Sequence, residues 1–215
     1  MKNIFLFLIF ISGISISIAQ QDPEAKKILD KLSEKTKSFK VIKTDFKIDF
    51  KNIKDDTQNT SNGTIVMKQD KYRMNFLGAE SFFDGETLWN YIPEVSEVNI
   101  TEQDPNSEDI FSNPKKLFTV YEEGYKYQFI NSITEKNIEY YIIDLYPIDL
   151  DEEYSRIRLQ INSKELLLKS ASIFGKEGSQ FYISFDNYDT SSNIEDSYFI
   201  FNSKDYPEVE IIDMR

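Results

Sequence analysis

The sequence contains neither cysteine nor histidine among its 215 residues. The absence of cysteine excludes disulfide bonds and thiol nucleophiles. The absence of histidine excludes imidazole bases, imidazole metal ligands and a Ser-His-Asp triad. A calcium site built from carboxylates alone would remain open to such a chain, but no D-x-[DN]-x-[DN]-G loop is present, and neither is a G-x-S-x-G motif. We therefore predict a protein with no catalytic residues, no bound metal ion and no cofactor.

Glycine and proline are also scarce, with seven and six residues, and there is a single tryptophan. So few glycines and prolines argue against long flexible linkers, and the length suits one domain with a real core. The formal net charge of −12 argues against nucleic-acid binding and against attraction to anionic lipid headgroups. The alternative interpretation of this charge is simply a solvated acidic surface.

The first nineteen residues have the pattern of a secretory signal peptide. A basic start at Lys2 precedes an apolar run over residues 4–18, and Ser17 and Ala19 supply the small residues that fit cleavage after Ala19. A run of about 15 residues is short for a membrane span of about 20, although an N-terminal anchor is the alternative. We predict a signal peptide over residues 1–19 and a single domain over residues 20–215.

Two helices are expected. Asp22 followed by Pro23 is a typical N-cap and first helical residue, and the spacing of the apolar residues predicts an amphipathic helix over residues 23–37. A second Asn-Pro pair at Asn113 predicts a short helix over residues 115–123, which ends at Gly124.

Most of the remaining chain alternates between apolar and polar residues, as half-buried strands do. Phe46, Ile48 and Phe50, for example, alternate with charged residues. About eleven short strands joined by short turns predict an antiparallel meander that bends into a barrel or half-barrel, because open flat sheets rarely grow so wide. The expected strands cover residues 42–51, 63–68, 72–76, 80–83, 87–92, 95–100, 125–133, 138–146, 156–161, 165–174, 180–186 and 197–201, with a further edge or tail over 206–215.

The stretch D-G-E-T-L-W-N-Y at residues 84–91 is the most distinctive in the chain. Asp-Gly predicts a tight turn, because glycine supplies the positive φ that such turns need. The aromatic strand that follows would present a large apolar face. That face is either covered by the protein itself or used to hold an apolar ligand.

Several segments together resemble the outer-membrane lipoprotein carrier family, LolA. They are A-x-x-I-L-x-x-L at 25–32, Phe39, Phe46, G-T-I at 63–65, Y-R at 72–73, D-G-E-T-L-W-N-Y-x-P at 84–93, D-L-x-P at 144–147 and F-x-F at 199–201. The resemblance implies an α+β fold that is mainly β, in which a curved antiparallel sheet forms an unclosed half-barrel lidded by short helices. It also implies a non-enzymatic periplasmic carrier that moves lipoproteins from the inner to the outer membrane.

The resemblance further implies partners and a binding site. The cargo would be the acyl chains of lipoproteins, with transient contacts to an inner-membrane ABC-type release complex and to an outer-membrane acceptor. We expect a monomer that binds no nucleic acid. The apolar strand positions predict a cavity lined by Phe46, Ile48, Phe50, Ile65, Met67, Tyr72, Met74, Phe76, Trp89 and Tyr91, under a lid formed by Leu117, Phe118 and Tyr121.

One position departs from the family pattern. Gln69 stands where the family carries an arginine that helps to gate the cargo, so the gate itself is not predicted. Arg73 is expected on the solvent side. The alternatives are a secreted structural or adhesive β-module with a filled core, a general lipid or glycolipid binder, and a hydrolase that uses a carboxylate pair such as Asp149 and Asp151.

Overall fold

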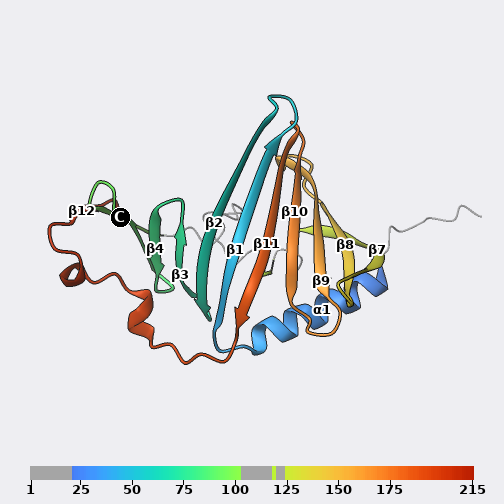
Figure 1. The fold of residues 1–215 in the computed structure, drawn as a ribbon, viewed down its shortest axis with the longest axis horizontal. Helices are drawn as coiled ribbons and strands as arrows, with labels where there is room; N and C mark the ends of the chain where they lie inside the picture. The colour runs from blue at the N-terminus through green and yellow to red at the C-terminus, as the bar shows by residue number, and fades with distance from the viewer. Residues whose placement is uncertain (1–20, 103–117, 120–123) are drawn as a thin grey trace, which may run out of the picture.

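The computed structural model describes residues 21–102, 118–119 and 124–215. They form one curved sheet of twelve strands with a single α-helix at one end (Figure 1). The elements are α1 (Pro23–Ser38), β1 (Ile42–Asn52), β2 (Thr57–Lys68), β3 (Lys71–Phe76), β4 (Ala79–Phe83), β5 (Thr87–Ile92), β6 (Glu97–Glu102), β7 (Tyr125–Glu135), β8 (Ile138–Pro147), β9 (Tyr154–Asn162), β10 (Leu168–Gly175), β11 (Ser179–Asp189) and β12 (Glu210–Asp213).

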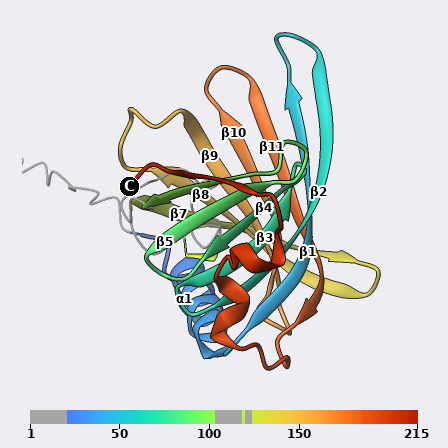
Figure 2. The same ribbon diagram turned by 90° about the vertical axis from the view of Figure 1, so that its left-hand side faces the viewer.

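The sheet is built from two meanders that meet side by side. β1 to β6 follow one another across one half, β7 to β11 follow one another across the other half, and β11 pairs with β1 in the middle. All neighbours are antiparallel except β12, which pairs with β6 in parallel at one edge. The strand order ends at β12 on one side and at β7 on the other, so the sheet is strongly curved but open (Figure 2). The predicted fold class is therefore confirmed.

Helix α1 begins where its sequence predicts. The Asp22 carboxylate accepts hydrogen bonds from the backbone N–H groups of Glu24 (2.9 Å) and Ala25 (3.2 Å), and Pro23 occupies the first helical position. The other carboxylate oxygen of Asp22 accepts the N–H of Phe129 on β7 at 3.0 Å. The Gln21 amide adds two further hydrogen bonds to the backbone of β7. One cap thus fixes both the start of the helix and its position against the edge of the sheet.

The main core lies on the concave, inner face of the sheet. There the apolar stripe of α1, which includes Ile28, Leu29 and Leu32, packs with inward side chains of β1, β2 and β8 to β11. Ile143, Leu145, Leu159, Ile161 and Ile183 are completely buried. Burying one such side chain contributes about 1.5–3 kcal/mol, so this face supplies most of the stability of the fold.

The C-terminal segment crosses the convex, outer face. We call residues 190–209 the strap; it contains two short 3-10 helices, Asp196–Phe199 and Ser203–Asp205, and leads into β12 (Figure 2). Phe199 is fully buried against Val41 and Val66. Phe201 packs with Phe82 and Val98. The sheet is thus covered on both faces, by α1 inside and by the strap outside.

Three expectations need correction or lie beyond the described part. Strand β2 begins at Thr57, although the expected strand began only at Gly63; the polar residues 57–62 form a hairpin with Lys47–Asn52, the second half of β1. Residues 197–201 were expected to be a strand, but most of them form the 3-10 helix Asp196–Phe199. The predicted signal peptide and nearly all of the second predicted helix lie outside the described residues.

Candidate functional site

The predicted cavity residues of β1, β2 and β3 share the inner face. The antiparallel register places Phe46 beside Gly63 and Gly63 beside Phe76, and it places Ile65 beside Met74. Side chains at paired positions point to the same side of a sheet. Eight of the ten predicted residues therefore lie on this face, namely Phe46, Ile48, Phe50, Ile65, Met67, Tyr72, Met74 and Phe76.

These eight side chains are not equally covered. Five are buried within the main core, which are Phe46, Ile48, Ile65, Met67 and Tyr72. Phe50, Met74 and Phe76 are half-buried, and the Phe50 ring lies 4.9 Å from the ring of Phe181. Leu88 on β5 is a further half-buried apolar residue against the same core. The inner face therefore keeps partly uncovered apolar surface at these positions.

Gly63 is placed where a side chain would collide with this surface. The Phe46 and Phe76 rings, 5.4 Å apart, belong to strands on either side of it. A Cβ atom at Gly63 would lie 2.3 Å from Cζ of Phe46 and 2.7 Å from the carbonyl oxygen of Asn75. The missing side chain makes room for the ring of Phe46 above the backbone of β2.

The predicted lid is described at one position. Phe118 is buried, and its ring packs 5.1 Å from that of Phe185 on β11, so it covers part of the inner face. Leu117 and Tyr121 lie outside the described residues.

Trp89 and Tyr91 lie on the other face of the sheet. They pack in the outer cluster with Phe82, and the Tyr91 ring is 5.9 Å from that of Phe201 on the strap and 4.5 Å from that of Tyr206. The inner face of β5 is instead represented by Leu88. The structure thus separates these two residues from the other eight.

Arg73 is not a free solvent-facing residue, contrary to expectation. Its guanidinium carbon lies 4.4 Å from the ring of Phe82 and 4.6 Å from the ring of Tyr198, and a nitrogen lies 2.6 Å from the Glu80 carboxylate. Tyr206 donates its hydroxyl to the other oxygen of Glu80 at 3.0 Å. Burial, together with this hydrogen bond, raises the pKa of Tyr206 to about 12. This network fastens the strap to β3 and β4. Gln69, at the expected gate position, lies in the turn between β2 and β3 with a φ of 54°.

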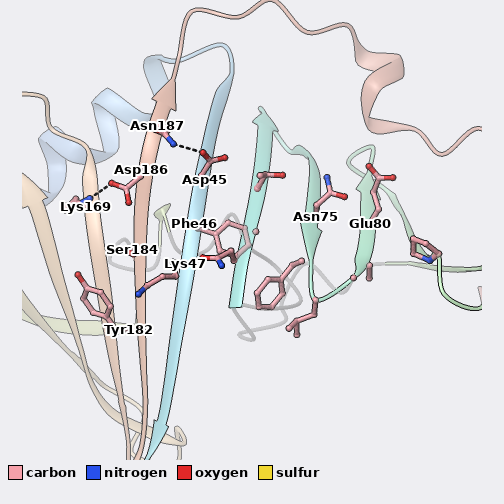
Figure 3. A pocket seen from close by; sticks show the side chains of 18 residues that line it. Asp45, Phe46, Lys47, Asn75, Glu80, Lys169, Tyr182, Ser184, Asp186 and Asn187 are labelled. Carbon is pink, nitrogen blue, oxygen red and sulfur yellow. Dashed lines mark hydrogen bonds and ion pairs between the residues drawn. The ribbon is translucent and has the colours of Figure 1, made fainter. Parts of the chain in front are cut away.

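A groove of about 1000 Å³ opens on the outer face, where β3 and β4 end beside β2 (Figure 3). Asp45, Asp186 and Glu80 line it together with Lys47 and Lys169. Asn187 donates a hydrogen bond to Asp45 at 2.7 Å, and Lys169 pairs with Asp186. These outward residues alternate with the apolar ones along β1 and β11, but their convergence depends on strands far apart in sequence, so the sequence alone did not reveal the groove.

The described residues form an open sheet with an apolar inner face, and they include no group of three or more acidic side chains placed to bind a metal ion. No helix within the described ranges is long and apolar enough to cross a membrane. The chain belongs to the LolA family, because the family model described as outer membrane lipoprotein carrier protein LolA matches residues 15–178.

The chain is also similar to several solved structures. An uncharacterized conserved protein from Thermus thermophilus superposes with a TM-score of 0.60 at 8% identity, over 88% of this chain and 99% of that one. A LolA superfamily protein from Nitrosomonas europaea has a TM-score of 0.45 at 14% identity, over 82% and 97%. A putative outer membrane lipoprotein-sorting domain from Vibrio parahaemolyticus has a TM-score of 0.48 at 9% identity, over 82% and 96%. No protein of curated function matches the chain in sequence.

Proposed function

We propose that this protein is a periplasmic, non-enzymatic carrier that binds the acyl chains of lipoproteins on the inner face of its sheet and moves them from the inner to the outer membrane. It would be exported by the signal peptide at residues 1–19 and act as a monomer. It would collect its cargo at an inner-membrane ABC-type release complex and deliver it to an outer-membrane acceptor. Membership of the LolA family supports this role.

The observation that carries the proposal is the half-buried apolar strip on the inner face. Phe50, Met74, Phe76 and Leu88 face the concave side and are covered only in part. Burying a methylene group contributes about 0.8 kcal/mol, so a 16-carbon chain would contribute about 13 kcal/mol at full burial. A strip that covers only part of such a chain recovers less, which allows both capture and release.

Flexible and aromatic side chains suit this task. Methionine adapts to ligands of different shape, and phenylalanine offers a large contact area. Met74 lies beside Ile65 on the neighbouring strand, and Phe76 lies beside Gly63 with its ring 5.4 Å from that of Phe46, so both add half-buried apolar surface at the border of the buried core.

One structural fact favours a second candidate. Phe46, Ile65 and Tyr72 are already buried by the protein's own core, as in a secreted structural module with a filled interior. The two functions differ in whether an acyl chain competes for the remaining strip.

Two neighbouring substitutions on β3 test the carrier function. Phe76→Asp places a carboxylate on the inner strip, whereas Asn75→Asp adds the same charge on the outer face of the same strand, where Asn75 is exposed. Displacement of a fluorescent hydrophobic dye by a palmitoylated peptide would report binding. We expect Phe76→Asp to weaken binding by at least about tenfold, because an unpaired charge would be buried beside the chain.

The control should bind within a factor of about two of the wild-type protein, and both variants should keep the wild-type circular dichroism spectrum. Organic extraction of the purified wild-type protein should also release bound lipid. Failure of the wild-type protein to bind the dye or the probe, or equal binding by both variants, would favour the filled module.

A further inference from the structure

Strand β2 is longer than its neighbour β3, and this leaves part of its edge open. β2 pairs with β1 along its full length, from Thr57 beside Asn52 to Met67 beside Ile42. It pairs with β3 only from Gly63 to Lys68. In Figure 1 the β1–β2 hairpin rises well beyond β3 and β4. No described strand pairs with residues 57–62 on the β3 side.

The direction of the backbone groups along this edge follows from the hairpin. Lys68 and Lys71 flank the two-residue turn between β2 and β3 and form its closing pair. Hydrogen bonding in an antiparallel ladder alternates, so the even-numbered residues of β2 direct their N–H and C=O groups toward β3. Beyond the end of β3, these are the groups of Gln58, Thr60 and Asn62. Three donors and three acceptors therefore face outward in the spacing of a strand.

The two outer edges of the sheet differ from this open edge, because other parts of the chain bond to their backbone groups. β12 pairs with the edge of β6, and the side chains of Gln21 and Asp22 form hydrogen bonds with the backbone of β7. β12 itself is only four residues long and begins and ends with an acidic residue. Short strands and charged residues protect edges from pairing, as do lysine and proline. Residues 57–62, T-Q-N-T-S-N, have none of these features, because all six are neutral hydroxyl or amide residues.

The open edge leads directly to both candidate sites. Where this edge meets β3, Asn62 and Gly63 line the outer-face groove, together with Leu77 and Gly78 of the turn that follows β3. Phe46 and Phe76 also line this groove; Phe76 belongs to the half-buried inner strip, and Phe46 is the buried ring 5.4 Å from it. A strand added beside residues 57–62 would continue the line of β3 and would bring one of its ends to this pair of rings.

We infer that residues 57–62 are a docking edge for an extended peptide, which adds to the sheet as an antiparallel strand beside β2. Resting on the proposed function, this peptide is the polar segment that follows the acylated end of the cargo, with its acyl chain on the inner face at Phe46 and Phe76. Strand addition of this kind obtains affinity from main-chain hydrogen bonds and depends little on side-chain sequence. It therefore suits a carrier with many cargoes. A neutral edge on a protein of net charge −12 favours a neutral or basic segment.

The experiment uses a synthetic probe with a palmitoyl chain and an eight-residue linker of Ser, Thr, Asn and Lys. Two matched probes carry N-methyl groups at alternate linker positions, one at odd and one at even positions. Only one set removes the N–H groups that face β2. We expect this set to bind about tenfold more weakly than the unmodified probe and the other set to bind normally. The amides of Gln58, Thr60 and Asn62 should exchange more slowly with solvent when the unmodified probe is bound.

Two protein variants complete the test. Thr60→Pro removes one outward N–H while leaving the β1 side of the ladder intact. Thr60→Val keeps this N–H but loses the 2.6 Å hydrogen bond from the threonine hydroxyl to Asp49. The gain from the linker is the tighter binding of the unmodified probe compared with palmitic acid, about tenfold. Thr60→Pro should lose this gain and Thr60→Val should keep it. Both variants should bind palmitic acid like the wild-type protein, which would show that they are folded.

Equal binding of the two methylated probes would overturn the inference, and so would a Thr60→Pro variant that keeps the gain. It would also be overturned if the amides of residues 57–62 in the free protein exchanged more slowly as the protein concentration rose, because a second copy of the chain would then occupy the edge. If no palmitoyl probe binds, the proposed function fails separately. The edge is then judged by amide chemical shifts with the unacylated linker. Shifts at Gln58, Thr60 and Asn62 support it, and their absence overturns it.

Discussion

Removing the phenyl ring of Phe199 should loosen the strap from the outer face. Phe199 has no exposed surface and lies against Val41 and Val66, which are 2% and 6% exposed. A buried Phe→Ala change costs about 3–5 kcal/mol when the surroundings cannot collapse into the cavity. For a protein of this size that corresponds to a fall of about 6–20 °C in the melting temperature.

The loss has a ceiling that the structure suggests. If the strap detaches before the sheet unfolds, the cost cannot exceed the free energy that holds the strap in place, and the sheet would melt almost as before. Urea denaturation followed by circular dichroism measures the loss in the free energy of unfolding of the sheet. Limited proteolysis measures detachment of the strap, because a released strap would be cut within residues 190–209 while the sheet remains intact.

The matched control is Ile200→Ala, at the next position of the strap, where the side chain is 44% exposed. This variant should change the free energy of unfolding by less than about 1 kcal/mol. If Phe199→Ala changed neither the melting temperature nor the proteolysis pattern, or if the control had an equal effect, burial of Phe199 would not be what holds the strap on the sheet.

Two further predictions concern the same face. Hydrogen bonds from Lys68 and Lys71 lower the pKa of Asp196 to about 2, below its ordinary value of 3.8. This contribution to strap docking is complete above pH 4 and is lost as the pH falls from 4 toward 2. Cleavage of the strap by an acid-stable protease should therefore become faster over that range. In Asp196→Asn the rate of cleavage should depend much less on pH. Trp89→Ala should lower the free energy of unfolding by about 2 kcal/mol and leave acyl-chain binding unchanged, because Trp89 packs beside Phe82 in the outer cluster; weaker binding without destabilisation would place it in the ligand site.

Elements determined by local sequence were predicted well. The Asp22-Pro23 start of α1, its apolar stripe, and the turn at Asp84 are all present, and the Asp84 carboxylate accepts the N–H groups of Glu86 and Thr87. Each depends on contacts within a few residues, where capping and turn rules apply directly. The alternation along β1 likewise predicted correctly which of its residues face inward.

Features that depend on distant segments were predicted poorly. Alternation showed that Trp89 and Tyr91 share a face, but Leu88 and Ile92 are also apolar, so it could not show which face is inner. The strap that covers Trp89 comes from far along the chain. The polar half of β2 looked like a loop because its strand conformation depends on pairing with β1. The aromatic residues near Phe199 looked like a strand because burial against Val41 and Val66 demands apolar residues in a 3-10 helix as well.

The position of β11 also determines the order in which the molecule can be assembled. β1 is the second element of the chain, yet one of its two partners is β11, which is synthesised only after β2 to β10. The first meander must therefore wait with one side of β1 unmatched, and the second meander must carry β11 to it as a late, long-range step. Such pairing is slow, because the entropy of closing a long loop is lost before the stabilising contacts between the two strands form. The β1–β11 seam is where we expect the newly made chain to depend most on protection from aggregation until its last strands emerge.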